Sequence, residues 1–159
     1  MFKRSEKVIY PKHGAGKIVK VQEETIGDKK SKYYKIQFLN SSVTVLVPID
    51  RAKELGMRYP LSRRGTKEVL NKLNRKVKID RKTLTTLDAI SKERLGSGKL
   101  EDVVSLVNLL RSLAKQKEEE NKNFSYSYSD RLEIAMDFIK SEAEIVLGKK
   151  AAEKYDLEK

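Results

Sequence analysis

The sequence predicts an α+β fold in which a small antiparallel β module precedes an all-α helical domain. Three observations predict it: apolar and polar residues alternate over the first sixty residues, apolar residues recur at helical spacing from Gly65 onward, and a segment at 57–62 containing Tyr-Pro separates the two patterns. Alternation is typical of half-buried strands, and recurrence every three or four residues is typical of amphipathic helices. We therefore expect two domains, at residues 1–60 and 61–159.

Four short strands are expected in the first domain. Their sequences are KVIY, GKIVKVQEETI, KYYKIQFL and VTVLVP, and turns are expected at Gly27-Asp28 and at Asn40-Ser41-Ser42. These residue types favour turns because they tolerate tight backbone conformations or bond their own backbone. Short strands with tight connections indicate a strongly bent antiparallel sheet or barrel.

The second domain begins with two expected helices. Val69, Leu70 and Leu73 mark a short first helix. The second begins near Asp80, includes the apolar residues Leu84, Leu87 and Ile90, and is ended by the Gly-Ser-Gly sequence at 96–98.

Two longer helices and a short terminal one are expected after residue 100. The third helix carries a stripe of Val103, Leu106, Val107, Leu110, Leu113 and Ala114. Ser127 with Asp130, or Asp130 with Glu133, gives the fourth helix an amino-terminal capping signature. Its stripe is Leu132, Ala135, Met136, Ile139, Ala143 and Val146, Gly148 ends it, and a short helix is expected at 151–155. We expect these stripes to form the core.

Positive charge is concentrated in the first two thirds of the chain. The net charge is +12 overall, +15 over residues 1–100 and −3 over residues 101–159, and residues 61–100 alone carry +8. A basic surface of this size is typical of proteins that face nucleic-acid phosphates. A lysine-rich surface that only maintains solubility is the alternative.

Residues suited to catalysis or metal binding are scarce. Cysteine is absent and His13 is the single histidine. His13 lies beside a turn without a nucleophile motif, and the glycines at 14–16 lead into a strand rather than into a phosphate-binding helix. We expect a protein that is not an enzyme and binds no cofactor or metal. His13 is expected to be structural, with a ring that hydrogen-bonds backbone groups at the bend between two strands.

Two further segments bear on function. FSYSYS at 124–129 has aromatic residues that either pack against the helices or stack on bases, and packing is favoured by its position beside a capping residue. The first seven residues include four charged side chains, and no apolar run approaches the ~18 residues of a membrane span. We therefore expect a cytoplasmic protein without a membrane contact.

The sequence also resembles a known family. KVIYPKHGAGKI, followed by VTVLVP and LGMR, resembles the opening module of the CarD-type (CdnL) bacterial transcription regulators, a module also found in transcription-repair coupling factors. The segments RLGSGKLEDVVSLVNLL and DRLEIAMDFIKSEAEIVLG lie where that family has its helical carboxyl-terminal domain. The resemblance covers nearly the whole chain, which lacks the helicase motifs of coupling factors.

The resemblance implies a two-part transcription regulator. A Tudor-like, SH3-like β module would dock on the β subunit of bacterial RNA polymerase by pairing strand edges. The helical domain would contact promoter DNA, mainly through its backbone and minor groove, at the upstream edge of the bubble and so modulate the stability of the open complex. The protein would be a monomer that is associated with the nucleoid through polymerase.

Polymerase-binding residues are expected on two strands. Two arginines that the family uses for docking align with Glu24 and Leu46, neither of which is basic. Thr25 and Ile26 beside Glu24 still suit an edge strand. We therefore place the polymerase contact at Glu24, Thr25, Ile26, Val45, Leu46 and Val47.

DNA-binding residues are expected on the second helix. The tryptophan that the family inserts into the minor groove aligns with Leu84, fourteen residues before Gly98. Leucine can act as an apolar wedge between base steps, or Leu84 can face the helical core. The arginines that follow the tryptophan are replaced here by a Thr-Thr-Leu sequence. We therefore place the DNA contact at Leu84, Arg81, Lys82, Thr86 and Lys92.

Two other functions remain open from the sequence. The basic middle of the chain would also suit a nucleoid-type protein that binds DNA without sequence preference and without polymerase. The uncharged strand at 43–48 suits a protein partner instead. An adaptor that binds polymerase but has lost the DNA wedge is the other alternative.

Overall fold

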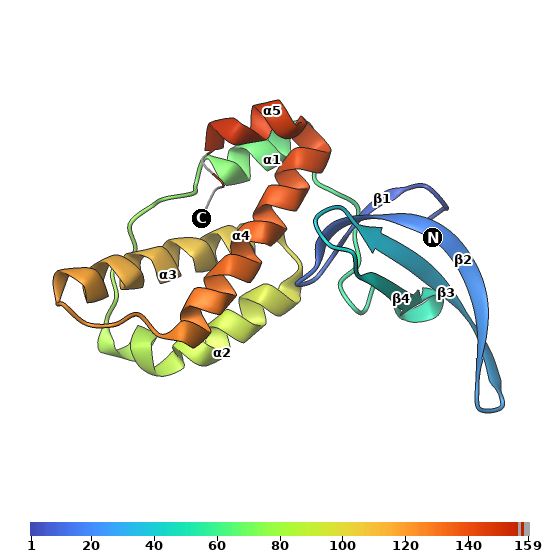
Figure 1. Cartoon of the computed structure of the whole chain (residues 1–159), viewed down its shortest axis with the longest axis horizontal. Helices are drawn as coiled ribbons and strands as arrows, with labels where there is room; N and C mark the ends of the chain where they lie inside the picture. Colours follow the sequence, from blue (N-terminus) through green and yellow to red (C-terminus); the bar gives the residue numbers. More distant parts are fainter. Residues whose placement is uncertain (156, 158–159) are drawn as a thin grey trace.

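The computed structural model describes residues 1–155 and Leu157, with a curved sheet at one end and a helical body at the other (Figure 1). Each strand of the four-stranded antiparallel sheet pairs with the one before it. The strands are β1 (Lys7–Tyr10), β2 (Gly14–Ile26), β3 (Lys29–Phe38) and β4 (Thr44–Pro48), followed by a 3-10 helix, η1 (Ile49–Arg51). The predicted α+β fold, a Tudor-like sheet followed by helices, is confirmed.

The helical body contains the expected helices. They are α1 (Arg63–Leu70), α2 (Arg81–Ser97), α3 (Leu100–Glu119), α4 (Tyr126–Leu147) and α5 (Lys149–Ala152), followed by a 3-10 helix, η2 (Glu153–Tyr155). The Asp80 side chain caps α2 by accepting from the Thr83 N–H at 2.7 Å. Gly98 ends α2 in the left-handed conformation, with φ of 69°, as the sequence predicted. No helix in the described part of the chain is long and apolar enough to cross a membrane.

The predicted cap of the fourth helix is wrong. Helix α4 begins at Tyr126, and its N-cap Ser125 makes no side-chain capping bond. The helix extends to this point because Tyr128 and the preceding Phe124 pack against the helical core, with ring centroids 6.3 Å apart. The packing role expected for the FSYSYS segment is thus confirmed for these two rings, whereas Tyr126 is exposed.

Strand β2 contains a β-bulge near its middle. Ile18 lies opposite Ile36 and Lys20 lies opposite Lys35, so Val19 is the extra residue between them. An extra residue of this kind bends a strand and increases its twist. Beyond the bulge, β2 and β3 continue together as a hairpin that projects from the sheet (Figure 1).

The molecule has two apolar cores that meet at the base of the sheet. One core lies inside the sheet and includes Ile18, Tyr34 and Val47. The other lies among the helices, and the sheet contributes Ile9 and Ala15 to it. The sheet is therefore packed against the helical body rather than tethered to it.

The segment at 57–62, which separates the strand pattern from the helical pattern in the sequence, is held in place by contacts with the sheet. Met57 is buried in the core of the sheet, and Arg58 exchanges two backbone hydrogen bonds with Ile9, at 2.8 and 3.0 Å. This segment is held against β1 before the chain enters α1, so it is part of the contact between the two halves.

Candidate functional site

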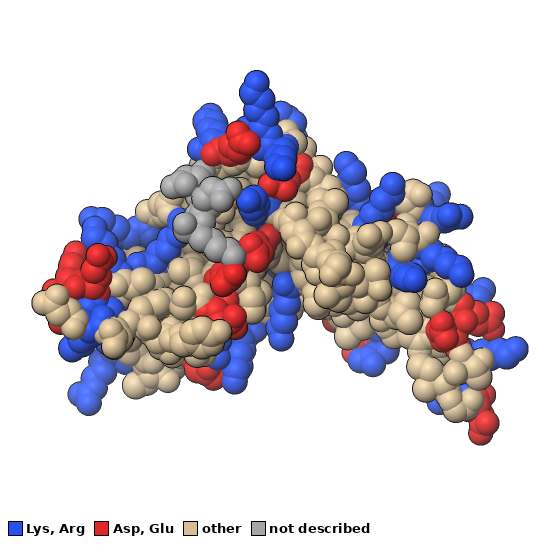
Figure 2. All heavy atoms as spheres, in the orientation of Figure 1, with Lys and Arg blue, Asp and Glu red and all other residues tan. Residues whose placement is uncertain are grey.

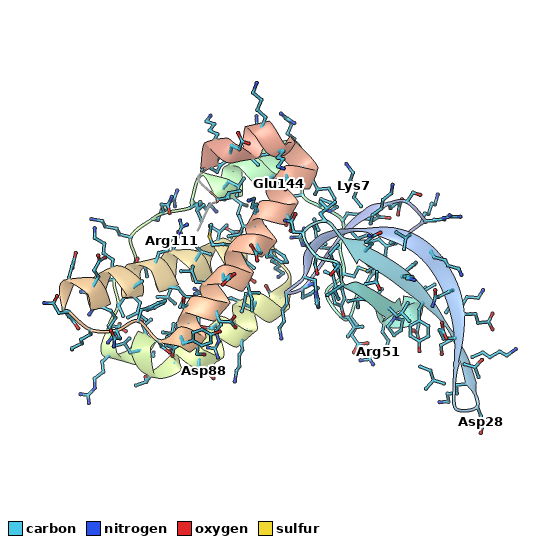
Figure 3. The ribbon with its side chains drawn as sticks, viewed as in Figure 1. Lys7, Asp28, Arg51, Asp88, Arg111 and Glu144 are labelled. Atoms are coloured by element: carbon cyan, nitrogen blue, oxygen red, sulfur yellow. The ribbon has the colours of Figure 1, made fainter. Side chains whose placement is uncertain are left out.

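The end of the β2–β3 hairpin presents unpaired strand edges. Strand β1 pairs with β2 only as far as Lys17, and β4 pairs with β3 only as far as Tyr33. Within the described part of the chain, residues 23–26 and 29–32 therefore pair only with each other. We call residues 23–32 the hairpin arm, whose tip is marked by Asp28 in Figure 3. Unpaired main-chain groups of this kind can accept an additional strand from a partner.

Three of the residues expected to bind polymerase lie on this arm. Ile26 is 68% exposed and Thr25 is also exposed. The Glu24 carboxylate is half-buried and accepts a hydrogen bond from Gln22 Nε2 at 2.6 Å. The structure thus gives Thr25 and Ile26 free side chains next to an open edge, while the Glu24 charge is held by its neighbour on β2.

The other three lie in β4, at the opposite edge of the sheet. Val47 is fully buried in the sheet core, so its side chain cannot meet a partner and only its main chain is available for pairing. Val45 is half-buried, whereas Leu46 is 44% exposed and lies directly opposite Lys35. The structure therefore does not bring the two predicted groups together, and the hairpin arm and β4 are separate candidate edges.

Leu84 is exposed near the start of α2. Its side chain is 41% exposed and is not part of the helical core, in contrast to Leu87 one turn later, which is buried. The structure therefore contradicts the alternative in which Leu84 faces the helical core. An exposed apolar side chain at this position is available to a partner.

The remaining residues expected to contact DNA do not form one patch with Leu84. At about 100° per residue, Arg81 and Lys92 lie within about 80° of Leu84, whereas Lys82 and Thr86 lie about 160° from it. The Thr86 hydroxyl donates to the Lys82 carbonyl at 2.9 Å, a bond within the helix. The helix therefore presents Leu84 with Arg81 and Lys92 on one side, and Lys82 with Thr86 on the other.

The charge of Lys92 is partly engaged by a neighbour. Its ammonium group lies 3.0 Å from Asp88, whose other carboxylate oxygen lies 2.5 Å from Arg131 of α4. The hydrogen bonds from Arg131 and Lys92 lower the pKa of Asp88 below its ordinary value, so this carboxylate stays charged. Asp88 adds a negative charge beside the predicted DNA face.

A basic loop ahead of α2 extends the positive surface. Arg75, Lys76 and Lys78 are exposed and lead directly into Arg81 and Lys82. The loop is anchored to α3, because Ser112 Oγ accepts from the Val77 N–H at 3.0 Å and Asn108 Nδ2 donates to the Lys72 carbonyl at 2.8 Å. The charge count of residues 61–100 included these cations, but no periodic pattern marked them individually.

Arg58 joins the sheet to the helical body. Its guanidinium donates to both carboxylate oxygens of Glu142 in α4, at 2.8 and 2.7 Å, and its Nε donates to the Gly98 carbonyl at 2.8 Å. The Glu142 side chain is fully buried and also accepts from the Leu61 N–H at 3.1 Å. A two-pronged charged pair with further hydrogen bonds compensates the carboxylate for its loss of water.

Pro11 packs between Gly56 and Gly98, where the sheet contacts the helical body. A Cβ atom added to Gly56 would lie 2.6 Å from Pro11 Cγ, and one added to Gly98 would lie 2.8 Å from it. Both glycines have positive φ, 90° and 69°. Side chains at these positions would therefore push the Pro11 turn away from the helical body.

The start of β2 contacts α4 directly. The Ala15 N–H donates to Ser141 Oγ at 2.9 Å, and a Cβ atom added to Gly14 would lie 2.2 Å from that oxygen. The Pro-Lys-His-Gly-Ala-Gly stretch is therefore the surface by which the sheet rests on the helix. We call this contact, formed by Pro11, Gly14, Ala15, Arg58, Gly98, Ser141 and Glu142, the sheet–helix joint.

His13 lies beside the sheet–helix joint and stacks on two aromatic rings. Its ring centroid is 4.9 Å from that of Phe38 and 5.9 Å from that of Tyr10. The expected structural role is supported, but in the described residues the ring makes stacking contacts in place of the backbone hydrogen bonds that we expected. Burial, with a smaller contribution from Lys12, lowers the pKa of His13 below its ordinary value. Among the described residues no group of three or more His, Asp or Glu side chains is placed to hold a metal ion.

A small sheet with open strand edges, fixed to a basic helical body, defines a two-part protein suited to contact with large partners. Residues 2–59 match the family model of the "CarD-like/TRCF RID domain". The Bacillus subtilis (strain 168) protein "Putative transcription factor YdeB" is 24% identical over 148 residues, which cover 93% of this chain and 94% of that protein. The CarD-type resemblance is thereby confirmed, and both matches support a role in transcription.

Proposed function

We propose that this protein regulates transcription by binding the β subunit of RNA polymerase through its sheet and promoter DNA through its helical body. The observation that carries the proposal is the open edge of the hairpin arm on a module that matches the RID family model, held at a fixed position by the Arg58–Glu142 pair. A rigid connection matters because a factor that touches polymerase and DNA together must keep its two contacts at a set separation.

The proposed action is a shift of the equilibrium between closed and open promoter complexes. A factor can shift that equilibrium only by binding one state more tightly, typically by ~1–3 kcal/mol in coupled systems. Leu84 would supply an apolar contact at the upstream edge of the bubble, with Arg81 beside it for phosphate. Leucine has less stacking surface than an aromatic residue, so the contact is expected to be a weak wedge.

The proposal is tested with purified protein, RNA polymerase and a promoter fragment that carries a fluorescent reporter of opening at fixed salt. Wild-type protein is expected to bind polymerase and to change the open fraction. Ile26→Asp should weaken polymerase binding at least about tenfold, because it places a charge beside a strand edge that must lose water on pairing. Tight DNA binding without any affinity for polymerase would instead identify a nucleoid-type protein.

The DNA contact is tested by Leu84→Ala in the same assay. We expect a smaller change in the open fraction with unaltered polymerase binding. Leu39→Ala is the matched control, because Leu39 is 51% exposed but lies directly after β3, away from α2. Normal opening with the Leu84 variant would remove Leu84 from the DNA contact, and polymerase binding without any effect on opening in the wild type would favour the adaptor alternative.

A further inference from the structure

The face of the sheet turned away from its core carries two pairs of lysines that lie directly opposite each other. Lys7 lies opposite Lys17 across β1 and β2, and Lys20 lies opposite Lys35 across β2 and β3. The alternate positions point into the sheet core, as Ile18 does. We call the surface formed by these four residues the lysine face.

The bulge at Val19 creates this arrangement. In an uninterrupted strand, residues three apart point to opposite faces, so Lys17 and Lys20 would be separated. The extra residue returns Lys20 to the side of Lys17, and the pairing with Lys35 shows that it has done so. Two cross-strand lysine pairs thus share one surface instead of being divided between the two faces of β2.

The lysine face is unfavourable for the isolated protein. Like charges directly opposite each other on neighbouring strands are destabilising. None of the salt bridges among the described residues involves any of the four lysines. The residues that lie opposite these lysines on the next strand are neutral. Gln37 of β3 lies opposite Lys17, and Leu46 of β4 lies opposite Lys35. The positive charge is therefore left without an internal partner.

The surface view supports this description. Lys and Arg side chains gather over the sheet close to the helical body, whereas acidic side chains appear further out along the hairpin (Figure 2). Lys7 marks this region near α4 (Figure 3). Because residues 1–60 carry a net charge of +7 and residues 61–100 carry +8, the positive surface continues from the sheet into the helical body.

We propose that the lysine face binds the sugar-phosphate backbone of duplex DNA. Its lysines are about 5 Å apart across strands and about 7–10 Å apart along a strand, so several can contact successive phosphates of one backbone. Lysine contacts of this kind position DNA without reading its sequence. This site goes beyond the proposed function, in which α2 makes the DNA contact, and it requires no polymerase.

The test measures binding of the full-length protein to a labelled duplex of about 30 base pairs by fluorescence anisotropy, at several salt concentrations and without polymerase. The variant replaces Lys7, Lys17, Lys20 and Lys35 with Gln. Each phosphate neutralised contributes about −0.9 to the slope of log K against log salt. We expect the slope to become shallower by about 2–4 and the affinity at low salt to fall at least about tenfold.

Two control variants separate the site from net charge. Replacing Lys29, Lys30, Lys32 and Lys53 with Gln removes the same charge from other exposed positions of the sheet module, and we expect at most about a threefold loss. Replacing the four residues of the lysine face with Arg keeps the charge and should retain affinity. Thermal unfolding checks that each variant is folded, and the pairs K7Q/K17Q and K20Q/K35Q replace the fourfold variant if it is not.

Three outcomes would overturn the proposal. Equal losses in the two Gln variants would mean that only net charge matters. An unchanged salt slope would mean that these lysines do not meet phosphates. Unaltered DNA binding combined with lost polymerase binding would assign the face to a protein partner, and since DNA binding is measured on the free protein, failure of the proposed polymerase contact leaves this test intact.

Discussion

The two ends of strand β2 have opposite surroundings. At its start, Gly14 and Ala15 are buried against α4 in the sheet–helix joint. At its end, Ile26 is 68% exposed on the hairpin arm, and a Cβ atom added to the turn residue Gly27 would meet nothing within 4 Å. One strand is therefore anchored at one end and presents an open edge at the other.

This difference shows how a small sheet can present an edge without losing its position. The open arm gains little from packing, so its orientation depends on the base of the sheet. That base is fixed by a fully buried carboxylate paired with Arg58 and by the Pro11 turn seated between two glycines. Substitutions in the sheet–helix joint should therefore be far more costly than equivalent substitutions in the arm or at exposed sites.

The largest expected effect is that of Glu142→Ala. The change leaves the partly buried Arg58 guanidinium and the Leu61 N–H without their acceptor, so we expect the free energy of unfolding to fall by about 3–5 kcal/mol. Urea unfolding measures this. Glu68→Ala is the control, because it removes an exposed pair with Arg64, and its effect should be below about 1 kcal/mol. Similar losses in the two variants would show that the joint does not depend on its buried pair.

The second largest effect on the free energy of unfolding is expected from Gly14→Ala, at the start of β2. Gly27→Ala, in the turn that follows β2, is the comparison. Both glycines have positive φ, 82° and 64°, so both changes carry a backbone cost of about 1 kcal/mol. Only at Gly14 does the new Cβ also collide with Ser141 Oγ and disturb its bond to Ala15. We expect losses of about 2–3 kcal/mol at Gly14 and about 1 kcal/mol at Gly27, measured by urea unfolding. Equal losses would mean that α4 moves away at no cost.

The smallest effect concerns the pH dependence of stability at the joint end of the sheet. Because the pKa of His13 is lowered in the folded protein, the folded state binds fewer protons at this site than the unfolded state does. The stability from His13 is therefore complete above its unfolded pKa of about 6.5 and is lost as pH falls through the folded value. His13→Phe keeps a ring against Phe38 and should reduce the stability difference between pH 7.5 and pH 5.5. An unchanged difference would exclude His13 as its source.

Local patterns were sufficient to predict most of the fold. Alternation located the four strands, and Gly98 ended α2 where its sequence indicated. The start of α4 was missed because a capping signature competes with tertiary packing, and the contacts of Phe124 and Tyr128 with the core extend the helix past both candidate caps. The bulge left a local trace as well, since the adjacent apolar pair Ile18-Val19 interrupts the alternation.

The candidate site was less predictable because it depends on contacts between distant segments. Arg58 and Glu142 are 84 residues apart, and no periodicity in either segment indicates the other. Glu142 did leave one signal, because it follows Ile139 by three residues and so occupies the apolar stripe of α4, where a carboxylate must have a partner. The exposure of Leu84 could not be predicted, since its spacing to Leu87 is also that of a core residue.

The bulge at Val19 has a consequence for how this protein can change during evolution. Deleting that single residue would leave Lys17 and Lys20 two positions apart, so both lysines and every later residue of β2 would keep their faces and their partners on β3. Only the bend and the added twist of the bulge would be lost. Relatives without this residue are therefore expected to keep the lysine face but to direct the hairpin arm differently.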